Sequence, residues 1–271
     1  MTIVKKKIPI QSPVKVHAVS QLPQIMAALI YGRSGTGKTT LASTFPKPIL
    51  LLDVREKGWD SVSNVPDLDI AEIESWEEFE AMYWYLSENL TKYKTIIIDQ
   101  VSQLQDLALL KALKDQGKEP TDNPSQRTFG QAAGLMKTWL LNYRDLIDRD
   151  IHIAFLAHDR TTEGEEGEDD QIDPSVGPRL MPSVASHLCG AVKVIGNTFI
   201  RETTEIEDKR KVRKISYALR IGPHSFFVTK SRTPVGSYLP RIIVDPTYDK
   251  VAAVMQGTFS ERAATVRKKV R

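Results

Sequence analysis

One stretch of the sequence combines glycines, a lysine and a threonine at the spacing that binds phosphate groups. Residues 32–39 fit the pattern G-x-x-x-x-G-K-[ST] at every defined position. Glycines let the backbone wrap a phosphate with its N–H groups, in dihedral angles that other residues rarely adopt. The pattern therefore predicts an ATP site, and the residues expected to contact ATP are Gly32, Arg33, Ser34, Gly35, Thr36, Gly37, Lys38, Thr39 and Thr40.

Within this loop, two side chains have distinct chemical roles. The Lys38 ammonium is suited to neutralise the β- and γ-phosphates, and the Thr39 hydroxyl to coordinate Mg²⁺. A second Mg²⁺ ligand is expected at the end of an apolar strand. Asp99 follows the run Thr-Ile-Ile-Ile about sixty residues after the loop, and we expect it to hold Mg²⁺ through water.

The elements around these residues are predicted by alternating apolar runs and amphipathic stretches. Ser75 and Glu78 form a capping-box pattern at the start of one of the helices. Strands are expected over residues 25–31, 48–53, 68–73, 95–99 and 151–158, and helices over residues 38–45, 75–90, 101–114 and 128–147. Apolar strands that alternate with helices are typical of a mostly parallel sheet covered on both faces.

Beyond about residue 190 the pattern changes to shorter strands, which indicates hairpins. These strands are expected over residues 191–197, 199–205, 212–221 and 225–230. The predicted fold class is therefore α/β, with a mostly parallel central sheet flanked by helices and with antiparallel strands at the C-terminal edge of that sheet.

Composition narrows the class of protein. The 271 residues include one cysteine, Cys189, so neither an internal disulfide nor a cysteine-based zinc site is expected. The 37 Lys and Arg nearly balance 34 Asp and Glu, for a net charge of +3. No apolar run has the length of a membrane span, and the N-terminus has no apolar signal core. We expect a soluble cytoplasmic protein.

Charge is unevenly distributed along the chain. Residues 1–24 are basic and contain no acid, and residues 258–271 form a basic tail. Residues 161–178 carry seven acids and no base, within a predicted mobile loop over residues 159–182 of a core spanning residues 25–257. The basic ends either contact nucleic acid or serve solubility. The alternation over residues 14–19 favours an oligomerisation strand.

With the two motifs placed, the order of the chain resembles a RecA-like ATPase core, in particular the small phage-encoded proteins of single-strand annealing and recombination. The resemblance extends over residues 25–257, and it implies a host-cell cytoplasmic location for a phage protein. Beyond the loop and residues 96–99, it is carried by residues 50–58, 155–158 and 229–232.

The resemblance implies three further site residues. RecA-like proteins place a catalytic glutamate after the second strand, and here Glu56 comes one residue later than usual, so it is either the base for the attacking water or a surface residue. His158 stands at a strand end, where a polar sensor of the γ-phosphate is expected, although a histidine there can also be an ordinary loop residue.

Lys230 and Arg232 point to one side of a late strand. In RadA, KaiC and DnaB relatives, such a pair reaches the γ-phosphate of the neighbouring subunit, which implies a ring or filament. The other interpretation is two solvated bases on an edge strand.

The main hypothesis is a Mg²⁺- and ATP-dependent ATPase that oligomerises on single-stranded DNA and promotes annealing or homologous recombination, with a single-strand binding protein as a further partner. Contacts to DNA are expected from residues 115–127 and 159–182, from the basic ends, or from Arg210, Lys211, Arg213 and Lys214. One alternative is a nucleotide-controlled, KaiC-like regulatory ATPase without DNA binding. A small-molecule kinase is another, although no Arg-rich lid segment is evident.

Overall fold

The structure is a computed structural model that describes residues 24–89, 92–163, 165–166, 171–172, 174–207 and 210–260. Most of the basic N-terminal segment (1–23) and most of the basic tail (261–271) lie outside the described residues. The predictions made for those two segments therefore stay predictions.

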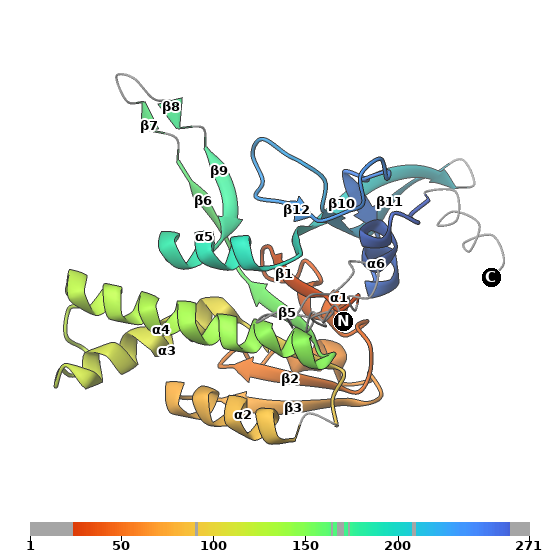
Figure 1. Ribbon diagram of the computed structural model, residues 1–271. Coiled ribbons are helices and arrows are strands. Elements are labelled where there is room, and N and C mark those ends of the chain that lie inside the picture. Colours follow the sequence, from red (N-terminus) through yellow and green to blue (C-terminus); the bar gives the residue numbers. More distant parts are fainter. Residues whose placement is uncertain are drawn as a thin grey trace, which may run out of the picture.

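A nine-stranded mixed sheet forms the centre of the described molecule (Figure 1). Its strands follow the order β13-β11-β10-β1-β5-β4-β2-β3, and β12 pairs with β10. Neighbours from β10 through β3 are parallel, whereas β11, β12 and β13 are antiparallel to their partners. The strands are β1 (Ala27–Tyr31), β2 (Ile49–Val54), β3 (Leu68–Ile73), β4 (Thr95–Asp99), β5 (His152–Ala157), β10 (Val194–Glu207), β11 (Arg210–Arg220), β12 (Lys230–Ser231) and β13 (Ile242–Val244). The predicted fold class is confirmed.

Helices cover both faces of the sheet, because successive residues of a strand point to opposite faces. Leu29 of β1 faces a core that includes Trp76 and Leu104, and the next residue, Ile30, faces a core that includes Leu41 and Val251. The first face carries α2 (Trp76–Glu88), α3 (Val101–Asp115), α4 (Gln126–Asp145) with η3 (Leu146–Arg149), and α5 (Pro182–Ala191). The second carries α1 (Lys38–Ala42), η2 (Trp59–Val62) and α6 (Tyr248–Gln256).

Local sequence signals explain where the helices begin. Ser75 and Glu78 form the predicted capping box of α2. A second capping box, formed by Ser125 and Thr128, starts α4 two residues before the predicted helix. Capping residues satisfy backbone N–H groups that the first helical turn leaves unpaired, which fixes the start of each helix.

The C-terminal half differs from the prediction in its strands and helices. The two strands expected over residues 191–197 and 199–205 are one 14-residue strand, β10. Gly196 is no turn residue: a Cβ there would lie 2.5 Å from the Leu219 Cδ1 atom, so glycine allows β11 to pack closely. The strand expected over residues 225–230 is reduced to Lys230–Ser231, and α5 and α6 were not predicted.

The acidic segment is the largest correction to the predicted fold. Instead of a loop, β6 (Asp159–Thr162) pairs with β9 (Ser175–Pro178), and β7 (Glu165–Glu166) pairs with β8 (Gln171–Ile172). The two pairs form an antiparallel ribbon that projects from the body of the molecule (Figure 1). Its base is tied to the sheet, because the Tyr31 hydroxyl donates to the Val176 carbonyl at 2.9 Å and Val176 N–H donates to the Phe226 carbonyl at 2.7 Å.

Candidate nucleotide site

The turn between β1 and α1 has the backbone of a phosphate-binding loop. Gly35 and Gly37 have φ angles of 76° and 85°, in the left-handed region that favours glycine. At Gly32 a Cβ would lie 2.5 Å from the Thr198 carbonyl oxygen. The geometry therefore requires glycine at Gly32 and favours it at Gly35 and Gly37. The remaining loop side chains are divided between solvent and protein: Arg33, Ser34 and Thr40 are exposed, and Thr36 is buried.

Lys38 is buried inside this loop. Its Nζ donates to the carbonyl oxygens of Gly32 and Arg33, both at 3.0 Å, and the residue is 8% exposed. Burial lowers the pKa of Lys38, while Asp99 and Glu56 raise it. Because the two acceptors are neutral carbonyls, the ammonium keeps its positive charge for an anionic ligand.

The loop is joined to the end of β4 by a hydrogen bond between the two predicted metal ligands. The Thr39 hydroxyl donates to Asp99 Oδ2 at 2.7 Å. Asp99 is 5% exposed, and burial raises its pKa to about 6 against the lowering effect of the Thr39 hydroxyl. A buried carboxylate is stabilised by a cation, and hydroxyl and carboxylate oxygens are ligands that Mg²⁺ prefers.

The donor set therefore fits Mg²⁺ held jointly by protein and phosphate oxygens. No group of three or more His, Cys, Asp or Glu side chains in the described part of the chain could hold a metal ion by itself. Thr39 would supply an oxygen ligand and Asp99 would hold the ion through water, and Mg²⁺ usually takes its other ligands from water and phosphate.

Glu56 lies in a turn after β2 that aims it toward the end of β5. Arg55 and Lys57, on either side of Glu56, have φ angles of 57° and 52°. Lys57 N–H donates to both carboxylate oxygens of the buried Asp53, at 3.1 Å each, which fixes the turn. Glu56 Oε1 comes within 3.8 Å of His158 Nε2. The structure thus brings two of the predicted residues together, despite the one-residue displacement of the glutamate.

His158 has a close partner that the sequence analysis missed. Gln100 Nε2 lies 2.6 Å from His158 Nε2, and the Ser102 hydroxyl accepts from His158 N–H at 3.1 Å. Burial lowers the pKa of His158, and the Lys38 charge lowers it further. A polar residue directly after Asp99, at the carboxyl end of a buried strand, was the available signal for Gln100.

Lys230 and Arg232 lie away from the loop of their own chain. Lys230 Nζ donates to the carbonyls of Cys189 and Gly190 at 2.7 and 3.0 Å, and Arg232 donates to the Gly190 carbonyl at 3.2 Å. Both side chains therefore bind the C-terminal end of α5, on one side of the strand. Lys230 pairs with Ile195, which is level with Leu29 in the middle of β1.

The hairpin of β10 and β11 supplies two more residues that the sequence analysis missed. The Thr198 and Thr36 hydroxyls lie 2.7 Å apart. Tyr217 lies against Gly37, where a Cβ would be 3.1 Å from the Tyr217 Cδ1 atom, and this tyrosine is 46% exposed. An aromatic ring beside the phosphate loop is a surface on which a nucleotide base can stack.

These features define a class of protein. A glycine-rich loop that follows β1 and opens α1, an aspartate that ends β4, and the order β3-β2-β4-β5-β1 of parallel strands make this chain a P-loop NTPase with a RecA-like core. A family model described as an AAA domain matches residues 25–233, and the chain belongs to that AAA domain family.

The solved structures that match the chain have low sequence identity to it and TM-scores below 0.5. The flagellar accessory protein FlaH from Methanocaldococcus jannaschii is 9% identical with a TM-score of 0.43, covering 81% of this chain and 84% of FlaH. A KaiC-like protein from Pyrococcus horikoshii is 11% identical with a TM-score of 0.36, covering 72% and 78%. EssC (ATPases 2 and 3) from Geobacillus thermodenitrificans is 16% identical with a TM-score of 0.30, covering 64% and 29%. No curated protein matches the chain.

Proposed function

We propose that the protein binds ATP with Mg²⁺, hydrolyses it, and oligomerises on single-stranded DNA to promote annealing or homologous recombination. The observation that carries the ATPase part is the 2.7 Å hydrogen bond from Thr39 to Asp99, which joins the phosphate loop to the acid that ends β4. Among the described helices, none is both long and apolar enough to cross a membrane.

In the proposed reaction, Glu56 accepts a proton from water as the water oxygen bonds to the γ-phosphorus and the bond to the β–γ bridging oxygen breaks. Lys38 neutralises charge on the phosphates from inside the loop. His158 contacts the γ-phosphate, 3.8 Å from the base. Thr39 directly and Asp99 through water would hold Mg²⁺, which when bound would neutralise charge on the phosphates.

We propose that Lys230 and Arg232 act on the nucleotide of a neighbouring subunit. The trans role is supported by the direction of the two cations, which project to one side of the sheet. Within its own chain, each cation is hydrogen-bonded to carbonyls of α5. If the pair acts in trans, mixing Arg232→Ala with Lys38→Ala subunits restores part of the activity that each variant lacks alone. A mixture as inactive as its components contradicts the trans role.

The DNA part is supported by the connection between α3 and α4. A cavity there is lined by two bases, one acid and three neutral polar residues: Lys118, Arg127, Asp115, Gln116, Ser125 and Gln131. Phe129, on the first turn of α4, is 45% exposed, and bases of single strands stack on aromatic rings. The segment therefore offers the two kinds of contact that single-stranded DNA requires.

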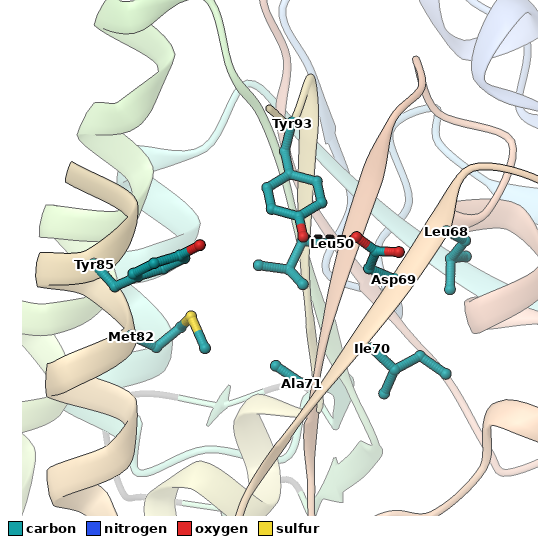
Figure 2. Close-up of a pocket in the computed structure, with 8 residues that line it drawn as sticks. All are labelled: Leu50, Leu68, Asp69, Ile70, Ala71, Met82, Tyr85 and Tyr93. Carbon is teal, nitrogen blue, oxygen red and sulfur yellow. Dashed lines mark hydrogen bonds between the residues drawn. The ribbon is translucent and has the colours of Figure 1, made fainter. Parts of the chain in front are cut away.

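The oligomer part is supported by an open edge of the sheet. Among the described strands, β3 pairs with β2 alone, so its other edge presents unpaired backbone groups. Figure 2 shows a groove over this edge, between β3 and α2, where Ile70 and Tyr85 are 41% and 54% exposed. The groove is lined by Leu50, Leu68, Asp69, Ile70, Ala71, Met82, Tyr85 and Tyr93.

We assign this groove to residues 14–19 of a second copy of the chain, added as a strand beside β3. Those residues alternate in the manner of a strand, and residues 1–22 carry four lysines and no acid. Residues 67–80, which include β3 and the start of α2, carry seven acids and no Lys or Arg. The opposite charges favour this occupant.

Light scattering on the full chain tests the assignment with two matched substitutions on opposite faces of the added strand. Val16→Asp removes an apolar contact and should lower the average mass toward the monomer. His17→Asp introduces an acid on the other face and should leave most of the oligomer intact. Equal masses for Val16→Asp and the unsubstituted chain contradict the assignment.

Steady-state ATP hydrolysis with and without single-stranded DNA tests the whole proposal, with Lys38→Ala as the control. We expect several-fold stimulation by DNA and its loss in the control. A rate indifferent to DNA, with tight ATP binding, contradicts the recombination role.

That outcome favours the second candidate, a nucleotide-controlled regulatory ATPase without DNA affinity. The observation that favours it is the ribbon of β6 and β9, which projects from the body of the molecule (Figure 1) and flanks residues 163–174, a stretch with seven acids and no base. Such a ribbon repels phosphate and suits a basic protein partner.

A further inference from the structure

A buried glutamine and the candidate γ-phosphate sensor form a contact between two nitrogen atoms. Gln100 is 0% exposed, and its Nε2 lies 2.6 Å from His158 Nε2. The other end of the same amide, Gln100 Oε1, is buried and has no hydrogen-bond partner among the described residues. Gln100 is also the N-cap residue of α3, yet its side chain makes no capping bond.

This contact restricts the proton positions on the imidazole. An amide nitrogen only donates, so the contact is a hydrogen bond only when the facing ring nitrogen carries a lone pair. His158 must then be neutral, with its single proton on Nδ1. Burial, which lowers the pKa of His158, favours the neutral ring independently. The hydrogen bond from His158 N–H to the Ser102 hydroxyl fixes the backbone position from which the imidazole ring extends.

The ring nitrogen that Gln100 occupies is also the one nearest to the carboxylate. Glu56 Oε1 is 3.8 Å from His158 Nε2, beyond hydrogen-bonding distance. With the lone pair of Nε2 engaged by the amide, the imidazole has no proton on this nitrogen to give to the carboxylate. The Glu56 oxygens therefore make no hydrogen bond to this imidazole nitrogen and stay available to water.

We propose that Gln100 is a positioning residue that holds His158 in the Nδ1–H tautomer and so keeps Glu56 free to accept a proton. The consequence for hydrolysis rests on the proposed function, whereas the tautomer does not. A second histidine, His152 at the start of β5, supplies a contrast with His158, which follows the end of that strand. Met26 N–H donates to His152 Nδ1 at 3.1 Å, which fixes the opposite tautomer, Nε2–H.

Long-range ¹H–¹⁵N spectra of the ¹⁵N-labelled full chain at pH 8 read the tautomer of each histidine directly. We expect His158 to carry its proton on Nδ1 and His152 on Nε2. In Gln100→Leu, which keeps the bulk and removes the amide, His158 should shift toward Nε2–H while His152 stays unchanged. Gln105→Leu is the matched control: it removes another α3 amide, whose oxygen accepts from Met181 N–H, and should leave His158 unchanged.

The kinetic expectation for Gln100→Leu is a kcat lower by roughly tenfold with KM for ATP unchanged, because the amide acts through His158 and the base. A His158 proton on Nε2 in the unsubstituted chain overturns the proposal, and so does a His158 tautomer that Gln100→Leu leaves unchanged. Should Gln100→Leu fail to fold, the spectrum of the unsubstituted chain decides. An inactive protein that has the expected tautomers contradicts the proposed function and leaves the positioning inference intact.

Discussion

Strand β5 carries a histidine at its amino end and ends just before another. His152 is 6% exposed, accepts from Met26 N–H, and packs against the rings of Phe45 and Tyr248. His158, directly after the carboxyl end, faces an amide and a carboxylate. The same residue type is therefore a fixed part of the core at one edge of the sheet and a group open to ligands at the other.

Two lysines, the partly buried Lys193 and the buried Lys38, differ between the two edges in the same way. At the amino edge, Lys193 Nζ donates to the Ile25 carbonyl at 2.6 Å, and burial and the Arg232 charge lower its pKa. At the carboxyl edge, Lys38 shares its surroundings with Asp99 and Glu56, both close enough to raise its pKa. Buried charge is thus gathered where parallel strands end, and this is where α/β sheets bind ligands.

The strongest test of this contrast replaces one lysine at each edge, the buried Lys38 and the partly buried Lys193. Lys38→Ala should lower ATP hydrolysis by about a thousandfold, because a preorganised charge at the phosphates is lost. Lys193→Ala should lower the Tm and leave kcat per folded molecule unchanged. Steady-state assays and thermal melts compare the two variants. A loss of kcat in Lys193→Ala as large as that in Lys38→Ala would contradict the assignment of function to the carboxyl edge alone.

A second test separates stability from activity at the carboxyl edge. Asp99→Asn should reduce Mg²⁺-dependent hydrolysis by about a hundredfold. In metal-free buffer at pH 8 it should raise the free energy of unfolding by about 2 kcal/mol, because burial raises the pKa of Asp99 to about 6 and the ionised form opposes folding.

The sign follows from proton binding. The folded state binds the Asp99 proton more tightly than the unfolded chain. The loss of folding stability caused by the ionised Asp99 is therefore complete above pH 6 and becomes smaller as the pH falls toward 4. Denaturant melts at pH 8 and pH 4 should therefore show the stability gap between Asp99→Asn and the unsubstituted chain closing at the lower pH. A gap of constant size contradicts the burial argument.

The sequence predicts those parts of the site that are local in the chain. The phosphate loop occupies eight consecutive residues, and its required backbone follows from glycine alone. Asp99 is predictable because a run of apolar residues identifies the strand that it ends. The parallel strands β1, β2, β4 and β5 were predictable for the same reason, and β3 begins and ends at the predicted residues.

Contacts that depend on strand pairing were beyond the sequence. Gln100 and His158 are 58 residues apart, and they meet only because β4 and β5 are neighbours. Tyr217 reaches Gly37 through the register of a hairpin whose first strand was predicted as two. The acidic ribbon was missed because charge suppresses the alternation that identifies a strand, and its pairing has to be read from backbone hydrogen bonds.

At the amino edge of the sheet, His152 should make the free energy of unfolding depend on pH. Burial lowers the pKa of His152 to about 4, so the unfolded chain binds the proton first as the pH falls below 6.5. Stability should fall by about 2 kcal/mol between pH 6.5 and 4 from this group. His152→Asn keeps an acceptor for Met26 N–H and does not titrate, so its denaturant melts should lose less stability over that range. Parallel curves for the two proteins would contradict a buried neutral His152.

The smallest effect is expected at the hairpin above the carboxyl edge, and it decides how far the ligand site extends. If the Tyr217 ring stacks on the base of a bound nucleotide, Tyr217→Ala should weaken ATP binding about fivefold, while Tyr217→Phe retains the ring and binds normally. Ile215 lies further along the same face of β11 and is 60% exposed, so Ile215→Ala is the matched control. Equilibrium titration with a fluorescent ATP analogue measures all three. Equal Kd values for Tyr217→Ala and the unsubstituted chain would confine the ligand site to the ends of the parallel strands, because the antiparallel hairpin would then contribute no contact to the base.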